Sequence, residues 1–330
     1  MRLFLPVMAT TFIWMSCWHL FGIRSNNPSH PAPEKNWFDE IWMWYCDFKN
    51  YSFFFHDKYF NKYNDHAWSL PLEMRGSILV WTVLLGLARC RTNMRLVLQA
   101  GLIWYFLYIT DGWYCAAFMT GMLLCDLELL DTNNQLPEMI SRLKALPHWI
   151  YYVFIGMSLY LAGVPSITED IGRLRESPGW TFLSYLKPQA FWDFRWFFRY
   201  WAATLAMIAI PRIPKLKGFF EGQFCQFLGR VSFSLYIVHG PILWSIGDRV
   251  YALLGRTHPG QLGTIPAYMD RLALPDWGPF GFEVNFLVAQ IILLPLTLWI
   301  AEMTTRLIDE PSLKFSKWLF NYTVAPKPRA

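Results

Sequence analysis

The chain has 330 residues, of which 54% are apolar, 18% aromatic and only 16% charged. Soluble domains carry about 25% charged residues, whereas an excess of Trp, Tyr and Phe is typical of lipid-facing helices with aromatic belts. The formal charge of +5 lies in short Lys and Arg clusters between apolar runs rather than in one basic stripe. These features exclude a soluble two-domain protein and argue against nucleic-acid binding.

Apolar runs of about 17–25 residues, the length that crosses a bilayer, occur along the whole chain. They are residues 3–22, 75–90, 96–112, 113–130, 148–165, 194–211, 229–250 and 283–306. Asp111 and Gly112 separate the third run from the fourth, so we expect a tight turn of an αα-hairpin there. We predict an all-α fold, a polytopic membrane helix bundle of about eight transmembrane helices, with residues 1–330 forming a single membrane domain.

Positive charges gather in alternate loops, which sets the predicted orientation by the positive-inside rule. The clusters are Arg89, Arg91 and Arg95; Arg142 and Lys144; Arg212, Lys215, Lys217 and Arg230; and Arg306, Lys314 and Lys317. Both termini are then cytoplasmic, and the loops 23–70, 166–193 and 251–282 lie on the opposite side. The first of these loops contains the sequon Asn50-Tyr51-Ser52, so we predict a glycoprotein.

The loop at residues 23–70 is unusually aromatic, and residues 37–46 fit an amphipathic helix lying in the membrane interface. Two interpretations stay open for this loop. It can anchor the protein in the interface, or it can form a lid over a hydrophobic substrate site.

Ionisable side chains inside membrane runs are costly and often functional. His239 lies within the seventh run with Tyr236 at i−3, so the two share a helix face. A neutral His in that position can accept a proton from a hydroxyl, or it can simply bond a neighbouring helix. Glu73 stands where the aromatic loop enters the second helix, with Arg75 as a possible partner. Asp65-His66 just upstream is either a base–orienter pair or an ordinary loop pair.

Other charged residues have simpler interpretations. Arg195 and Arg199 lie one turn apart and either extend to the interface or bind an anion. We expect Asp126 to be solvated at a helix end, and Glu302 to pair with Arg306 at i+4.

Four segments together resemble the acyltransferase 3 family of multi-pass membrane acyltransferases, and its fungal branch in particular. Residues 66–77 (HAWSLPLEMRGS) are similar to the family's W-[ST]-[LI]-x-x-E-x-x-x-S signature, and residues 228–239 (LGRVSFSLYIVH) to its L-G-x-x-S-[YF]-x-L-Y-x-x-H helix. Residues 118–126 and 308–312 are weaker matches. The four occur in family order and span nearly the whole chain.

The resemblance implies transfer of an acyl group, usually from acyl-CoA, to a hydroxyl of a sugar, lipid or small metabolite. It also implies that this chain begins at the family's third helix, since Arg2 to Pro6 match only the tail of the R-x-x-R-[LI]-x-x-P element linked to acyl-CoA. In the family, the first of the two preceding helices carries the histidine generally taken as catalytic. His19 is in the wrong helix to replace that histidine, and His239 belongs to another family segment.

We therefore expect a membrane O-acyltransferase that moves an acetyl group from acyl-CoA to a small, apolar, hydroxylated metabolite, as in secondary metabolism. The expected catalytic residues are Glu73 and His239; the expected substrate-binding residues are Trp68, Arg75, Tyr236 and His66; and Arg2 is expected to meet the acyl-CoA phosphates. No bound cofactor or metal is implied, and the partners are acyl-CoA, the acceptor and the bilayer. The alternatives are an inactive remnant, or a transporter or lipid-binding protein with the aromatic loop as its gate.

Overall fold

The computed structural model describes residues 3–23, 30, 32–56, 60–141, 147–166, 170–257, 261, 265–278 and 283–324. The elements formed by these residues are helices and turns, with no strand in the described ranges, which confirms the all-α class. The chain divides into two compact units, the first comprising Met1–Met74 with Gln226–Ala330 and the second Arg75–Cys225.

Helices occur at all eight predicted apolar runs, but only some meet the requirements of a membrane span. Four helical segments are long and apolar enough by length and composition, namely Phe4–Phe21, Asp65–Leu87, Trp113–Thr132 and Val284–Thr323. His148–Ala162 is apolar but shorter. Large apolar side chains also point outward; Leu85 is 79% and Ile291 72% exposed, as lipid contact requires. A membrane helix bundle is supported, and the count of about eight stays a prediction.

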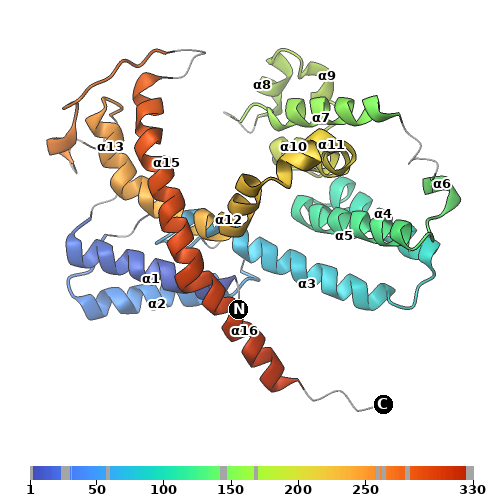
Figure 1. Ribbon diagram of the computed structural model, residues 1–330, viewed down its shortest axis with the longest axis horizontal. Coiled ribbons are helices and arrows are strands. Elements are labelled where there is room, and N and C mark those ends of the chain that lie inside the picture. The colour runs from blue at the N-terminus through green and yellow to red at the C-terminus, as the bar shows by residue number, and fades with distance from the viewer. Residues whose placement is uncertain are drawn as a thin grey trace. The chain divides into compact units, whose positions relative to one another are not determined.

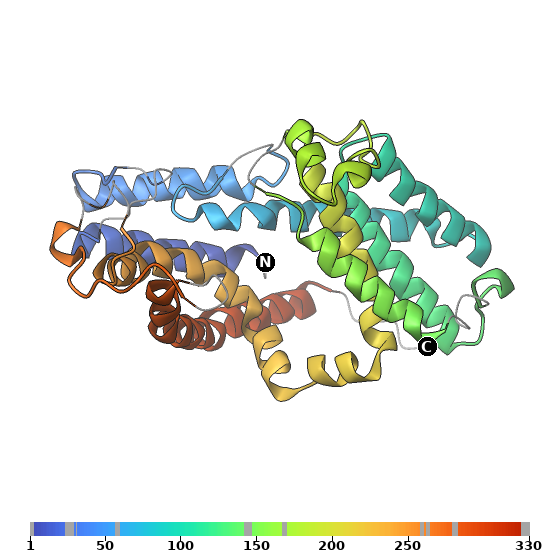
Figure 2. The same cartoon turned by 90° about the horizontal axis from the view of Figure 1, so that it is seen from above.

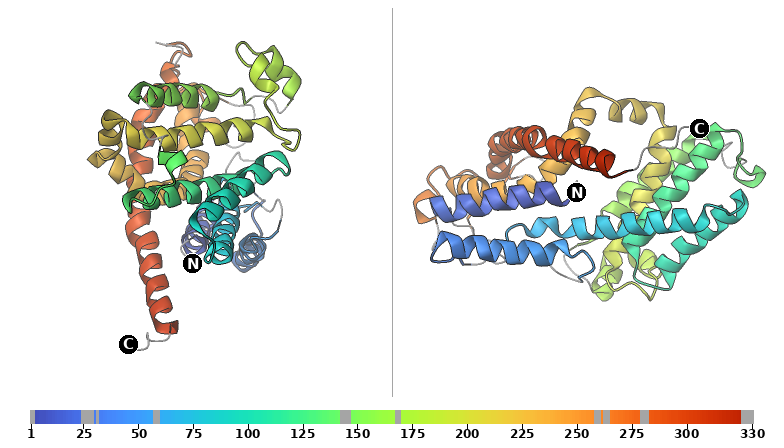
Figure 3. Two further views of the ribbon diagram at one scale, coloured as in Figure 1. Left: turned by 90° about the vertical axis from the view of Figure 1, so that its right-hand side faces the viewer. Right: turned by 90° about the horizontal axis from the view of Figure 1, so that it is seen from below.

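The first unit holds both ends of the described chain. Its elements in chain order are α1 (Phe4–Phe21), α2 (Trp37–Ser52), the 3₁₀ turn η1 (Asp65–Trp68), the start of α3 (Ser69–Leu87), most of α12 (Gln223–Ile242), the π-turn η4 (Leu243–Gly247), α13 (Asp248–Leu253), the 3₁₀ turn η5 (Pro266–Tyr268), α15 (Val284–Thr304), the π-turn η7 (Thr305–Asp309) and α16 (Glu310–Thr323). Through η7 the last two helices form one continuous rod, drawn in red in Figure 3.

The predicted amphipathic helix at 37–46 is confirmed as a helix and is longer, since α2 runs to Ser52. It lies beside α1 (Figures 1 and 2), with an unexpected orientation. Phe38 is 81% and Trp42 63% exposed, whereas the carboxylates of Glu40 and Asp47 are buried. α2 thus exposes Phe38 and Trp42, whereas Trp37, Trp44 and Tyr51 pack toward the core of this unit on the same side as the two acids. Its interfacial position stays a prediction.

The two buried carboxylates of α2 hold the segment that precedes η1. Glu40 accepts hydrogen bonds from the Tyr63 hydroxyl and from the backbone of Glu34, each at 2.7 Å. Asp47 accepts one from the backbone of Lys62 at 3.0 Å. Burial and the bond to Glu40 raise the pKa of Tyr63. The acids on α2 thus fix the chain immediately before Asp65-His66.

The second unit contains the remaining helices. They are the rest of α3, α4 (Thr92–Tyr108), α5 (Trp113–Thr132), α6 (Glu138–Ser141), α7 (His148–Ala162), α8 (Ile171–Glu176), α9 (Thr181–Ser184), α10 (Phe194–Ala209), the 3₁₀ turn η3 (Ile210–Arg212) and α11 (Pro214–Phe220). Helices α4 and α5 form the predicted αα-hairpin around Asp111-Gly112, and α7 packs along α10 (Figure 1). A Cβ atom on Gly112 would lie 2.9 Å from Phe106, so this turn needs glycine.

Aromatic side chains fill the core of the second unit. Phe191, Phe194, Phe197 and Phe198 are buried together with Trp180. Trp113 on α5 and Trp196 on α10 stack with ring centroids 4.0 Å apart. Tyr200 also belongs to this core, and its hydroxyl hydrogen-bonds that of Thr120 at 2.6 Å.

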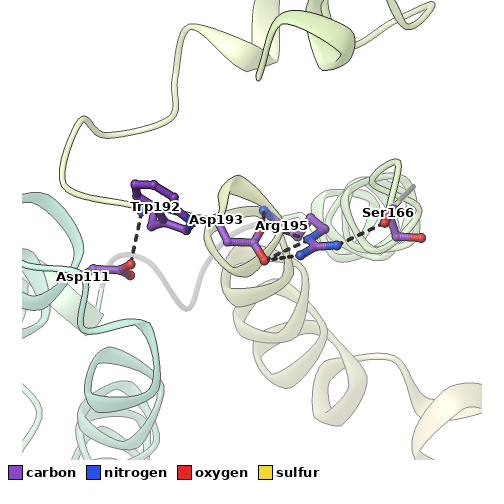
Figure 4. A network of polar contacts seen from close by, with 5 residues as sticks. All are labelled: Asp111, Ser166, Trp192, Asp193 and Arg195. Atoms are coloured by element: carbon purple, nitrogen blue, oxygen red, sulfur yellow. Dashed lines mark hydrogen bonds and ion pairs between the residues drawn. The ribbon is translucent and has the colours of Figure 1, made fainter. Parts of the chain in front are cut away.

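Two of the charged residues in this unit have partners that the sequence did not reveal. Asp126 is not simply solvated, because it accepts hydrogen bonds from Arg95 at 2.7 and 2.8 Å and from Gln99 at 3.0 Å. Arg195 binds the Asp193 carboxylate, with a shortest distance of 2.7 Å, and donates to the Ser166 carbonyl at 3.1 Å (Figure 4). Figure 4 also shows Asp111, whose carboxylate accepts a hydrogen bond from the backbone N–H of Trp192 at 3.1 Å.

Candidate active site

The first unit brings four of the sequence-predicted site residues together. His66 lies on η1, Glu73 on the first turns of α3, and Tyr236 and His239 on α12. The rings of His66 and His239 have centroids 4.6 Å apart. Segments about 170 residues apart in sequence therefore meet at one imidazole pair.

Tyr236 is the centre of the polar contacts that join η1, α3 and α12. Its hydroxyl donates to the backbone carbonyl of His66 and lies 2.9 Å from the Ser69 hydroxyl, which donates to it. The Ser69 hydroxyl in turn lies 3.4 Å from Oε1 of Glu73. A chain of polar groups thus leads from Glu73 to the turn that carries His66.

The hydrogen bond of His239 defines its neutral form. Nδ1 of His239 lies 2.7 Å from the backbone carbonyl of Tyr236. A carbonyl oxygen can only accept, so Nδ1 must carry the proton in that contact. In the neutral imidazole Nε2 then holds the lone pair. Nε2 of His239 can then accept a hydrogen bond from a hydroxyl, as a general base must.

Pro241 explains how α12 is joined to the segment before η1. Proline has no N–H, so inside a helix it leaves the carbonyl of residue i−4 without its usual donor. Here that carbonyl belongs to Ile237, and the side-chain amide of Asn64 donates to it at 2.8 Å. Asn64 is fully buried. The freed carbonyl of α12 therefore becomes the attachment point for the chain that leads into His66.

The π-turn that follows Pro241 places an indole against His66. Trp244 lies in η4, and its ring stacks on His66 with an interplanar angle of 8° and centroids 4.9 Å apart. Gly240 makes this approach possible, because a Cβ there would lie 2.5 Å from Cδ2 of His66 and 2.8 Å from the Trp244 ring. π-Turns are frequent at functional sites, and this one places the Trp244 ring beside the imidazole pair.

The backbone of η1 is also held from α2. The Tyr51 hydroxyl donates to the carbonyl of Ala67 at 2.8 Å, and both residues are fully buried. Tyr51 belongs to the predicted sequon; Asn50 beside it is exposed on α2, and its glycosylation stays a prediction.

The remaining predicted residues are placed differently. Trp68 lies in the same turn as His66 and is half-buried. Arg75 begins the second unit, where it hydrogen-bonds the Tyr114 side chain; its pairing with Glu73 stays a prediction. Arg2 lies outside the described residues. His19 is 3.4 Å from Glu40, apart from the His66–His239 pair, and Glu302 pairs with Arg306 as predicted, at 2.5 Å.

Sequence reasoning missed Asn64, Gly240 and Trp244. The sequence did contain one signal for such a contact, Gly240-Pro241 directly after His239. A proline inside an apolar helix leaves the carbonyl four residues earlier without its usual backbone donor. The identity of the donor was not readable, since Asn64 is 173 residues away in the chain.

A model of a family described as an acyltransferase domain, acyltransferase 3, matches residues 1–304 of this chain. The chain is similar to the O-acetyltransferase PaAT-1 of Phomopsis amygdali, with 25% identity over an alignment of 349 positions that covers 97% of this chain. It spans 65% of the length of that relative. No solved structure was found to match the chain.

Proposed function

The chain belongs to the acyltransferase 3 family, and on this premise we propose that it transfers an acetyl group from acetyl-CoA to a hydroxyl of a small, apolar metabolite. The observation that carries the proposal is His239, whose Nδ1 is tied to the Tyr236 carbonyl beside the His66 ring. A relative that is named as an O-acetyltransferase favours acetyl as the group and oxygen as the acceptor atom.

The proposed reaction needs one base, which removes a proton from the acceptor hydroxyl and later gives it to the leaving thiolate. Nε2 of His239 takes the proton of the acceptor hydroxyl while the hydroxyl oxygen forms a bond to the thioester carbonyl carbon. The carbonyl oxygen of the resulting tetrahedral adduct carries the negative charge, which nearby donors must stabilise. The C–S bond then breaks, and the proton on His239 passes to the departing thiolate. The products are an acetate ester and CoA, and His239 is neutral again.

The surrounding residues have supporting parts in this proposal. Glu73, Ser69 and Tyr236 hold the turn that carries His66, so they orient the imidazole pair. His66 and Trp68 line the acceptor side. Arg2 is assigned to the acyl-CoA phosphates and Arg75 to substrate binding on the sequence resemblance alone. Membership in a secondary-metabolite route would follow from the acceptor, which the assay below identifies.

The test uses the full chain in lipid nanodiscs with radiolabelled acetyl-CoA and a panel of apolar alcohols. Release of the CoA thiol and labelled ester are measured together. H239Q is expected to lower transfer by about 10²–10⁴-fold, the usual contribution of a general base. The matched control is H148Q, because His148 begins α7 in the second unit and has no part in the imidazole pair.

Three outcomes separate the alternatives. Ester formation that survives H239Q contradicts the assigned base. Wild type without ester or thiol release across the panel favours an inactive family member. Flux of a panel compound across the membrane of sealed vesicles, without covalent change, favours a transporter.

A further inference from the structure

A third histidine lies close to the imidazole pair but takes no part in the steps proposed above. His30 precedes α2, and its ring lies against three tryptophans, with centroids 6.4 Å from Trp14, 5.4 Å from Trp18 and 4.7 Å from Trp244. Trp14 and Trp18 come from α1 and are buried. We refer to Trp14, Trp18, His30 and Trp244 as the tryptophan cage.

The cage contains polar atoms that have no hydrogen-bond partner among the described residues. These are both ring nitrogens of His30 and the indole Nε1 of Trp14, and all three atoms are buried. Leaving a buried polar group unpaired lowers stability, and each such group in a native structure requires an explanation. A ligand that supplies oxygen atoms would satisfy them.

His30 is neutral under ordinary conditions. Burial lowers its pKa to about 4; the nearby Asp65 carboxylate opposes this shift and His66 reinforces it. A neutral imidazole has one donor and one acceptor, which matches the two roles of a hydroxyl group. With the Trp14 N–H the cage offers two donors and one acceptor.

The surroundings of the cage favour an uncharged ligand. The described neighbours of His30 are aromatic rings, together with the carboxylate of Asp65. Tryptophan faces suit an apolar body, and a carboxylate nearby repels the phosphates of a CoA. The cage therefore suits the acceptor better than the acyl donor.

Trp244 connects the cage to the proposed base. His30 contacts its ring edge-to-face at 87°, and His66 stacks on it at 8°. His66 lies next to His239. A molecule held by His30 is thus separated from the imidazole pair by a single indole.

We propose that the tryptophan cage binds the acceptor, an uncharged compound with an apolar body and a hydroxyl or carbonyl oxygen that His30 and Trp14 recognise. The identification of the ligand as the acceptor rests on the proposed function. The chemistry of the ligand is inferred from the cage itself.

The test measures binding in the absence of acetyl-CoA. Three probes share one ring system: 1-naphthylmethanol, 1-methylnaphthalene, which lacks the hydroxyl, and 1-naphthoate, which is charged. Binding to the full chain in nanodiscs is measured by ligand-observed NMR, with empty nanodiscs subtracted. The alcohol is expected to bind wild type most tightly, and naphthoate least.

H30F removes both ring nitrogens and keeps an aromatic ring. It is expected to weaken binding of 1-naphthylmethanol by about tenfold, the effect of one or two hydrogen bonds, and to leave 1-methylnaphthalene unchanged. W14F, which removes only the indole N–H, is the second variant and should weaken the alcohol by a smaller factor. H148F is the matched control and should change neither probe.

Equal loss of alcohol and hydrocarbon in H30F would overturn hydrogen bonding by the cage, as would unchanged binding of the alcohol in both H30F and W14F. No specific binding of the alcohol to wild type above the empty nanodiscs would also overturn the proposal. These outcomes are independent of catalysis, because failure of the proposed function shows as absent thiol and ester release while the cage still binds its probes.

Discussion

The two units of the chain bury different kinds of side chain. The second unit closes around Phe and Trp rings, and its charges at Arg95–Asp126 and Arg195–Asp193 are paired at 2.7 Å. The first unit buries Glu40, Asp47, Asn61 and Asn64, and several of its buried polar atoms have no partner among the described residues.

We expect this difference to separate a stable scaffold from the region of the candidate site. An apolar core gains stability from every buried ring, whereas buried polar groups lower stability unless they are fully paired. Strain and unpaired polar groups persist at functional sites because the surrounding structure holds them in place. The first unit is therefore where changes should affect chemistry, and the second where they should affect stability alone.

The largest effect is expected from G240A. The new Cβ would meet the His66 ring at 2.5 Å and Trp244 at 2.8 Å, so one of these rings must move away from His239. A displacement of about 1 Å can cost 10²-fold in rate, and we expect acetyl transfer to fall by about that factor. G229A, on the same helix with nothing within 4 Å of its Cβ, is the control. Equal activity of the two variants would contradict the importance of this packing.

The second prediction uses Asn64 and Pro241 together. N64L leaves the Ile237 carbonyl without its donor, which should lower the free energy of unfolding by about 1–3 kcal/mol and transfer by roughly tenfold. P241A returns a backbone N–H that can bond this carbonyl. The double variant should then recover thermal stability but not activity.

Recovery of both properties in the double variant would show that Asn64 acts only through helix stability. Recovery of stability alone identifies Asn64 as a positioning residue for His66. Thermal unfolding and transfer rate, measured on the same nanodisc samples, distinguish these outcomes.

Much of the site was predictable, because its residues sit in local patterns. His239 and Tyr236 share a helix face by spacing alone, and Glu73 and His66 flank one helix start; the structure joins all four. The hydrogen-bond partners of the predicted residues were harder to predict from the sequence. Arg75 hydrogen-bonds Tyr114, a residue on another helix that local spacing does not reveal, and its pairing with Glu73 stays a prediction.

The fold shows the same division between local and distant information. Apolar length predicted a helix at every run, and the αα-hairpin at Asp111-Gly112 followed from turn chemistry. The buried acids of α2 were not predicted, because the groups that hold them, the Tyr63 hydroxyl and the backbone of Lys62, lie outside the helix.

The third prediction concerns acid. His30 has its pKa lowered to about 4, whereas an unfolded histidine titrates near 6.5. Between those values the unfolded chain binds a proton that the folded chain does not, so stability falls as the pH is lowered from about 6.5 to 4. The loss should reach ~3 kcal/mol. H30F should lose less stability than wild type over this range, and H148F should not differ from wild type; parallel curves for H30F and wild type would contradict the burial of a neutral His30.

The smallest effect on transfer is expected in the second unit, from D126N. Asp126 receives Arg95 through two hydrogen bonds and Gln99 through a third, so the amide leaves a guanidinium without its counter-charge. Breaking such a partly buried pair costs about 3 kcal/mol, which thermal unfolding should register as a clear loss. E128Q is the control, because Glu128 is exposed two residues further along α5 and should change stability by less than about 0.5 kcal/mol.

At a temperature where both variants are folded, acetyl transfer should stay within about twofold of wild type, since no group that contacts the reacting atoms is altered. A tenfold fall in transfer by folded D126N would mean that the second unit contributes to the chemistry, and the contrast between the two units would no longer hold.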